Sequence, residues 1–295
     1  GWVAYFYSHV PSLQRPTSAI SDFPGLSTIY LRVPWAYIEP TENNYNWSAL
    51  DMPAQRWIAK GKKIAIRVTA SENWKRFATP EWVKDAGAIG NFIDYDGTPT
   101  DVWGPDYTNS TFQNKLEDLI RDMAVHFNDN PDVAFIDIGT YGLWGDGTTA
   151  TSSKLNETDH QTAVQGQIDM YQNYFPQELV SVSDNVDNDH AVNPTDYAQG
   201  KENLTLRIVQ PVPADPTAET WPREGIADTF KDQNPIILEY GHQGSAKGMG
   251  AIDNPDHLLE AVKRYHASYV SINNPGDFFL NDKDIVREIN KILGY

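Results

Sequence analysis

Residues 28–68, TIYLRVPWAYIEPTENNYNWSALDMPAQRWIAKGKKIAIRV, contain the unit from which the fold can be predicted. Thr28–Val33 and Lys63–Val68 are short runs of mostly apolar residues, which is typical of strands that are buried on both faces. Between them, Ser48–Lys60 has helical periodicity, and Gly61 follows it as glycine commonly follows the end of a helix. This order predicts two parallel strands that are joined by a helix.

The same unit recurs along the chain. Six further strand-like runs are Trp2–Tyr7, Val133–Ile138, Leu179–Val182, Leu204–Val209, Pro235–Glu239 and Ala267–Ile272. Five further segments with helical periodicity are Phe112–Phe127, His160–Tyr174, Arg223–Lys231, Asp256–Tyr265 and Lys283–Leu293. Eight strands that alternate with helices predict an α/β fold, a (β/α)8 TIM barrel, as a single domain over residues 1–295. An open, doubly wound sheet is the structural alternative.

Composition and the absence of motifs exclude several classes of protein. The chain has 23 Lys and Arg against 40 Asp and Glu, a net charge of −17, whereas nucleic-acid binding depends on clustered cations. It has no cysteine, so disulfides, zinc–thiolate sites and thiol nucleophiles are excluded. No stretch is apolar enough to span a membrane, and the N-terminus GWVAYFYSHV lacks signal-peptide features, so we expect a soluble, mature chain. No metal or cofactor is expected either, because no Rossmann or His-Glu-x-x-His motif is present. The sequence says nothing of the oligomeric state.

Aromatic and polar residues gather where the predicted strands end. In a TIM barrel the active site lies at these ends and in the loops that follow them. The residues there that we expect to bind substrate are Trp35, Arg67, Trp74, Tyr141, Trp144, Asn185, Gln210 and His242. Rings can stack on sugars and forked polar groups can bind neighbouring hydroxyls, so this set predicts a carbohydrate ligand.

Two arginines occupy corresponding positions in neighbouring strands. Arg32 and Arg67 are the penultimate residues of the runs that end in LRV and IRV, so alternation points both side chains to the same face. If that face is the barrel interior, each arginine needs a carboxylate partner, such as Asp137 or Glu239, because an unpaired buried charge is costly.

Three segments resemble glycoside hydrolases of clan A. Leu31–Trp47 (LRVPWAYIEPTENNYNW), followed by a helix and GKKIAIRV, resembles the second and third βα units of the β-galactosidase-like branch. Phe135–Thr148 (FIDIGTYGLWGDGT) resembles the fourth-strand segment of related barrels. Pro235–Gly241 (PIILEYG) resembles the seventh strand, which ends in the catalytic nucleophile. The resemblance implies a glycosidase that acts with retention on an oligo- or polysaccharide, such as a β-galactoside or an algal galactan. We expect this enzyme to be secreted or periplasmic.

The resemblance also implies that Glu239 is the nucleophile. The residues support this independently, because a glutamate that closes the apolar run PIIL needs either a function or a partner. A structural salt bridge, for which Arg207 on the preceding strand is a candidate, is the alternative.

The second carboxyl group, the acid/base, is less well defined. The clan places an Asn-Glu pair at the end of strand four, where this chain has Asp137-Ile-Gly-Thr-Tyr. We predict Asp146 in the Trp-Gly-Asp-Gly turn as the acid, and Glu72 and Asp184 are the alternatives. The missing glutamate keeps a second function open, namely a carbohydrate-binding pseudoenzyme with a degenerate site.

Overall fold

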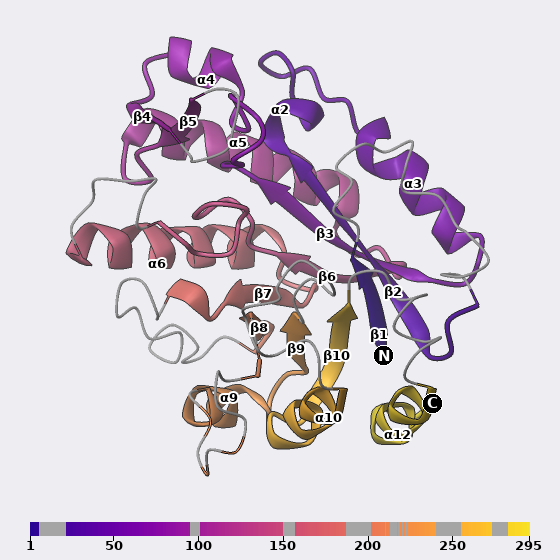
Figure 1. Ribbon diagram of the computed structural model, residues 1–295. Helices are drawn as coiled ribbons and strands as arrows, with labels where there is room; N and C mark the ends of the chain where they lie inside the picture. The colour runs from indigo at the N-terminus through magenta and orange to yellow at the C-terminus, as the bar shows by residue number, and fades with distance from the viewer. Residues whose placement is uncertain are drawn as a thin grey trace.

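Eight parallel strands close into a barrel (Figure 1). The computed structural model describes residues 1–5, 22–94, 101–149, 157–186, 202–209, 211–212, 217, 219, 221, 223–239, 255–272 and 283–295. The barrel strands are β1 (Trp2–Tyr5), β2 (Leu26–Pro34), β3 (Lys63–Thr69), β6 (Val133–Asp137), β7 (Val180–Ser183), β8 (Leu204–Val209), β9 (Ile236–Glu239) and β10 (Ala267–Ile272). Because β1 pairs with both β2 and β10, the barrel is closed, and the (β/α)8 prediction is confirmed against the open sheet.

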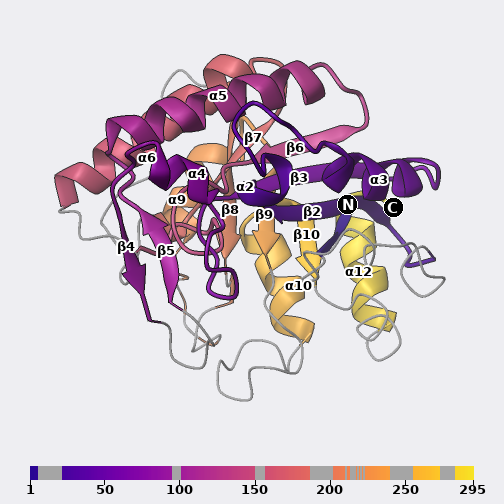
Figure 2. The same ribbon diagram turned by 90° about the horizontal axis from the view of Figure 1, so that it is seen from above.

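Helices surround the barrel, as the views from two directions show (Figures 1 and 2). They include α3 (Ser48–Ile58), α5 (Ser110–Phe127), α6 (Glu157–Tyr174), α9 (Glu224–Phe230), α10 (Pro255–Arg264) and α12 (Lys283–Leu293). Each coincides with a predicted helical segment to within a few residues. Within the described ranges, no helix combines the length and the apolar character that crossing a membrane requires.

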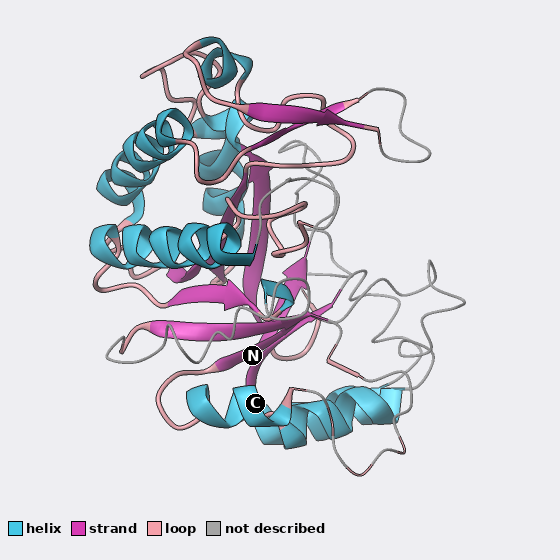
Figure 3. Ribbon diagram, turned by 90° about the vertical axis from the view of Figure 1, so that its left-hand side faces the viewer, coloured by secondary structure: helices cyan, strands magenta, loops and turns pink. Residues whose placement is uncertain are grey.

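The loops after β2 and β3 contain elements that the sequence did not predict. These are α2 (Trp35–Ile38), α4 (Glu81–Asp85) and an antiparallel pair formed by β4 (Gly90–Ile93) and β5 (Val102–Pro105). The β4–β5 hairpin lies beside α4 and outside the barrel (Figures 1 and 2), and Figure 3 shows it at one edge of the molecule. The strands of the hairpin have four residues each, which is too short for a recognisable alternation.

Strand alternation arranges the barrel interior in layers. A small apolar cluster inside the barrel consists of Val3, Tyr5, Tyr30, Ala65, Phe135 and Ile237. Arg67, Asp137 and Glu239 each follow a member of this cluster by two residues, so their side chains face the interior one layer nearer to the C-terminal strand ends. The apolar cluster thus forms a floor beneath a layer of charges.

Candidate functional site

Three arginines and three carboxylates meet inside the barrel. We call this set the charged layer: Arg32, Arg67, Arg207, Glu72, Asp137 and Glu239. Arg67 lies between two carboxylates, with Nε 2.6 Å from Asp137 Oδ2 and Nη2 3.1 Å from Glu239 Oε2. Arg207 makes the same pair of contacts, with Nε 3.2 Å from Asp137 Oδ1 and Nη1 2.5 Å from Glu239 Oε2. The prediction that Arg67 pairs with Asp137 and Glu239 is therefore confirmed, whereas Arg32 pairs with a different carboxylate, Glu72.

Asp137 is the structural centre of the charged layer. Besides the two arginines, Ser181 Oγ donates to it at 2.5 Å and the Tyr30 hydroxyl donates to its other oxygen. Burial alone would raise the pKa of Asp137, but the arginines and these hydroxyls lower it to about 2. Asp137 is therefore a fully ionised and fully bonded group, which leaves it unsuited to donating a proton.

Glu239 differs from Asp137 in having a side chain that reaches solvent, with 16% of it exposed. Burial raises its pKa, but Arg207 and Arg67 outweigh this effect, and the net pKa is below the usual value. Both arginines bind Oε2, and within the described residues no donor contacts Oε1. The predicted salt bridge between Glu239 and Arg207 is therefore present, and it leaves Oε1 of the carboxylate available to a substrate. The role of Glu239 as nucleophile stays a prediction.

Glu72 is saturated by donors. Arg32 binds both of its oxygens, with Nε 2.9 Å from Oε1, while Thr69 Oγ1 donates to Oε1 at 2.7 Å and Trp74 Nε1 to Oε2 at 3.0 Å. A carboxylate has about four acceptor positions, so these four hydrogen bonds leave none for a glycosidic oxygen. This geometry disfavours Glu72 as the acid/base.

The turn that carries Asp146 has an unusual backbone. Gly142, Trp144, Gly145 and Gly147 all have positive φ, with Trp144 at 58°. A bulky residue in this region is an outlier that the surroundings must hold in place. Gly145 packs so closely on Gly139 that a Cβ atom would lie 2.4 Å from the Gly139 carbonyl oxygen. The Gly-rich motif GLWGDG therefore follows from the backbone geometry of the turn.

Three side chains, two of them from the charged layer, hold this turn by its successive carbonyl groups. Arg67 Nη1 donates to Trp144 O at 3.2 Å, Arg207 Nη2 to Gly145 O at 3.1 Å, and Ser183 Oγ to Asp146 O at 2.6 Å. The two arginines that bind Glu239 thus also fix the backbone that carries Asp146. This is how strands β3, β7, β8 and β9 bring the two carboxyl groups to one end of the barrel.

The environment of Asp146 favours its protonated form. Burial raises its pKa, and the hydrogen bond from Thr148 N at 3.0 Å and the charges of Arg207 and Arg67 only partly oppose this effect. The charge of Glu239 raises the pKa further. Two carboxyl groups with opposite pKa shifts at one end of the barrel suit the roles of an acid and a nucleophile. Asp146 as the acid stays a prediction.

Asp184 belongs to the outer face of the barrel. Ser183 points inward to the Asp146 carbonyl, so the next residue along the strand faces the helices. There Asp184 Oδ2 lies 2.8 Å from Arg223 Nε, and its Oδ1 accepts from Val209 N at 2.8 Å. Burial raises the pKa of Asp184 to about 6, against the opposing charge of Arg223. The position of this group, and not its pKa, disfavours it as the acid.

Two of the predicted sugar-binding rings are buried in the core, which disfavours a role in stacking on a sugar. Trp35 is fully buried, with its Nε1 bonded to Glu39 at 2.8 Å and its ring packed on Trp82 and Phe112. Tyr141 is also buried, and its hydroxyl lies 2.5 Å from His160 Nδ1.

The other predicted substrate-binding residues divide into three groups. Trp74 and Trp144 have exposed or partly exposed side chains beside the charged layer, and Asn185 is half-buried after β7. Arg67 binds Glu239 directly. Gln210 and His242 lie outside the described residues. Arg207 was considered only as a structural partner, although its run LTLRIV repeats the Leu-Arg and Ile-Arg pattern of β2 and β3 and could have identified it.

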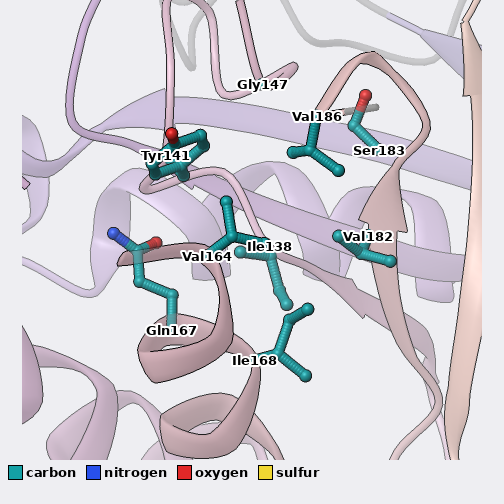
Figure 4. Close-up of a pocket in the computed structure, with 9 residues that line it drawn as sticks. All are labelled: Ile138, Tyr141, Gly147, Val164, Gln167, Ile168, Val182, Ser183 and Val186. Atoms are coloured by element: carbon teal, nitrogen blue, oxygen red, sulfur yellow. The ribbon is translucent and has the colours of Figure 1, made fainter. Parts of the chain in front are cut away.

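A small pocket lies between α6 and the sheet, below Gly147 (Figure 4). Its lining is mostly apolar and comprises Ile138, Tyr141, Gly147, Val164, Gln167, Ile168, Val182, Ser183 and Val186. A hydroxyl-rich ligand needs more polar partners than this pocket offers, so we place the candidate substrate site at the charged layer and the turn.

Comparisons with known proteins bear on the family resemblance and on the fold. The sequence model of the β-galactosidase family, glycoside hydrolase family 42, matches residues 24–141. A match to a probable mitochondrial ketol-acid reductoisomerase of Schizosaccharomyces pombe has 32% identity over 74 residues, and it spans 25% of this chain and 16% of that protein. A match of this length is too short to indicate that the two proteins share a fold or an activity.

Solved structures with the same fold include several carbohydrate-active enzymes. The catalytic domain of β-amylase from Paenibacillus polymyxa superposes with a TM-score of 0.63 at 12% identity, over 93% of this chain and 94% of that one. The exo-β-1,4-mannosidase Op5Man5 from Opitutaceae bacterium strain TAV5 has a TM-score of 0.55 at 13% identity, with 92% and 51% covered. Endo-glycoceramidase II from Rhodococcus sp. has a TM-score of 0.53 at 13% identity, with 92% and 72% covered. The family match and the shared fold thus confirm the resemblance to clan A glycoside hydrolases that the sequence motifs indicate.

Proposed function

We propose that this protein is a retaining glycosidase in which Glu239 attacks the anomeric carbon and Asp146 protonates the leaving oxygen. The observation that carries the proposal is the opposite pKa shift of two carboxyl groups that Arg67 and Arg207 fix at the same end of the barrel. The arginines keep Glu239 ionised, and burial keeps Asp146 easier to protonate than a solvated aspartate.

The first step forms a covalent intermediate. Glu239 Oε1 bonds to the anomeric carbon while the glycosidic C–O bond breaks, and the proton of Asp146 moves to the departing oxygen. Because both arginines already bind Oε2, they orient the carboxylate without blocking Oε1. In the second step the ionised Asp146 takes a proton from water, the water oxygen bonds to the anomeric carbon, and Glu239 leaves as a carboxylate.

The substrate we propose is a poly- or oligosaccharide with β-linked galactose, because the family model that matches residues 24–141 is that of β-galactosidases. The half-exposed ring of Trp74 and the neighbouring ring of Trp144 supply stacking surfaces. A polysaccharide is too large to enter a cell intact, so we also propose that the protein acts outside the cytoplasm.

Release of 4-nitrophenol from aryl β-galactosides, β-glucosides and β-mannosides tests the activity, and proton NMR of the first sugar product tests the stereochemistry. We expect release from at least the β-galactoside, with the β-anomer of the free sugar appearing first. Initial formation of the α-anomer would instead indicate inversion, which needs carboxyl groups about 6.5–9.5 Å apart.

A carbohydrate-binding pseudoenzyme is the second candidate. The observation in its favour is that the strand-four position, where the clan has its acid, lies at Asp137 within the charged layer. An aryl leaving group needs little protonation, so an intact nucleophile should still release it. If no aryl glycoside released 4-nitrophenol and calorimetry nevertheless showed that an oligosaccharide binds, the pseudoenzyme would be favoured.

A further inference from the structure

Two neighbouring cations at the edge of the candidate site rest on aromatic rings. Lys75 Nζ lies 4.5 Å from the centroid of the Tyr37 ring. The guanidinium carbon of Arg76 lies 4.8 Å from the Phe92 centroid and 5.7 Å from that of Phe77. Across the described part of the chain, neither cation has a carboxylate within ion-pair distance. This is notable in a chain with a net charge of −17, where acidic partners are plentiful.

The segment that carries these cations begins at the charged layer. Trp74 Nε1 donates to Glu72 Oε2 at 3.0 Å, and Asn73 Oδ1 accepts from Trp144 Nε1 at 3.0 Å. Trp144 N also donates to Ser71 O at 2.8 Å. Ser71 and Asn73 are therefore bonded directly to Trp144, in the turn that carries Asp146.

The same segment ends at the β4–β5 hairpin. Trp103 N donates to Arg76 O at 2.8 Å, and Phe77 forms a bridge with Trp103. An extended chain covers at most about 3.6 Å per residue, so Arg76 lies within about 11 Å of Asn73. The cations thus occupy a position that a second or third sugar of a bound chain could reach.

Exposed rings accompany the cations. Trp74 is 40% exposed and lies 6.4 Å from the Tyr37 ring, and Phe92 on the hairpin is 44% exposed.

Partial burial lowers the pKa of Lys75, and no charged group offsets this cost of burying the ammonium group. A bound anion would remove the cost, since an opposite charge favours the charged form of the lysine.

We infer that residues 73–77 and the β4–β5 hairpin form a subsite for a sugar that carries an anionic group, a carboxylate or a sulfate. The inference rests on the proposed function for the identity of the ligand as a carbohydrate. The exposed ring of Trp74 offers a surface for the apolar face of a sugar, and Lys75 and Arg76 supply positive charge for anionic substituents of the bound chain.

Selectivity between acidic and neutral chains of equal length tests the subsite. The probes are a galacturonate oligosaccharide for the carboxylate, a sulfated galactan oligosaccharide for the sulfate, and a neutral β-galacto-oligosaccharide. We compare binding by calorimetry in the Glu239→Gln background, so that no probe is consumed. We expect at least one acidic probe to bind about tenfold more tightly than the neutral one, with an affinity that falls as salt increases.

Lys75→Gln and Arg76→Gln should each lower this selectivity ratio about threefold, because each removes one of the two charge-assisted contacts that together give the tenfold ratio. Lys60→Gln is the matched control, since Lys60 is an exposed lysine between α3 and β3 at the opposite end of the barrel, and it should leave the ratio unchanged. Equal binding of all three probes, or an unchanged ratio in both variants, would overturn the subsite while glycosidase activity stands. Selective binding in a protein without any turnover would support the subsite and reject hydrolysis.

Discussion

Glu239 and Asp146 are carboxyl groups at the same end of one barrel, and they are held in opposite ways. Glu239 closes strand β9, and two arginine side chains bind its Oε2 atom directly. Asp146 lies in a turn whose carbonyl groups bind the same arginines, while its own carboxyl group accepts from a backbone amide.

The difference lies in which atoms the cations contact. At Glu239 the positive charges meet the carboxylate itself and lower its pKa, whereas at Asp146 they meet the backbone and burial prevails, so that pKa is raised. One pair of arginines can therefore prepare a nucleophile and position an acid. The two arginines and burial together set the two protonation states apart.

Replacing the nucleophile should have the largest effect on activity. Glu239→Gln removes the attacking oxygen, and we expect kcat to fall by about 10⁴-fold or more, because loss of a catalytic nucleophile has effects of this size or larger. The amide still accepts hydrogen bonds from Arg67 and Arg207, so a thermal melt should show the barrel folded. Glu42→Gln is the control, because this exposed glutamate pairs with Lys115, away from the charged layer. Full activity of Glu239→Gln would contradict the proposed mechanism.

Neutralising the centre of the charged layer should mainly affect stability. Asp137→Asn keeps the shape of the side chain but leaves Arg67 and Arg207 with one carboxylate fewer, and we expect a loss of about 3–5 kcal/mol in the free energy of unfolding. Urea unfolding measures this loss. Asp137 also raises the pKa of Glu239, so the acidic limb of the rate profile should move to lower pH in the variant.

Asp118→Asn provides the control for this substitution. Asp118 forms an exposed pair with Arg121 at 2.7 Å, and exposed pairs contribute at most about 1 kcal/mol. If both variants lost the same small amount of stability, the charged layer would not be the central element that its contacts indicate.

The sequence predicted the parts of this molecule that depend on periodicity. The eight strands and six helices have clear patterns, and the positions of Arg32 and Arg67 in corresponding strands predicted their inward direction. The pairing of Glu239 with Arg207 could also be anticipated, because a glutamate at the end of an apolar strand needs a nearby cation.

What the sequence did not give depends on contacts between distant segments. Trp35 follows β2 as a substrate-binding ring would, yet α4 and α5 cover it, and nothing in its local sequence indicates those helices. The β4–β5 hairpin beside Arg76 was not predicted, because its four-residue strands are too short to show an alternating pattern. The hydrogen bonds to the carbonyl groups of Trp144, Gly145 and Asp146 depend on how the turn folds back over the barrel, which local sequence does not indicate. The clustered glycines indicate only that the turn is strained.

The acid should show the smallest and most selective effect. Asp146→Asn cannot donate a proton, and we expect kcat/KM for an alkyl glycoside or oligosaccharide to fall about 10²–10³-fold, within the usual range for general acid catalysis. An aryl glycoside with a good leaving group should lose much less in the first step. Comparing the two substrates in one variant measures protonation separately from attack by Glu239.

The pH profile supplies an independent measure of the same group. An acid works only while protonated, so wild-type activity should fall as pH rises through the raised pKa of Asp146, and this basic limb should disappear in Asp146→Asn. The acidic limb, set by protonation of Glu239, should remain. Asp184→Asn is the matched control, because its carboxyl group also has a raised pKa but faces Arg223 outside the barrel, so it should leave the basic limb in place. The opposite result, in which Asp184→Asn removed the basic limb and Asp146→Asn kept it, would contradict the assignment of Asp146. Asp184 would then be the acid, and its ion pair with Arg223 would have to open during turnover.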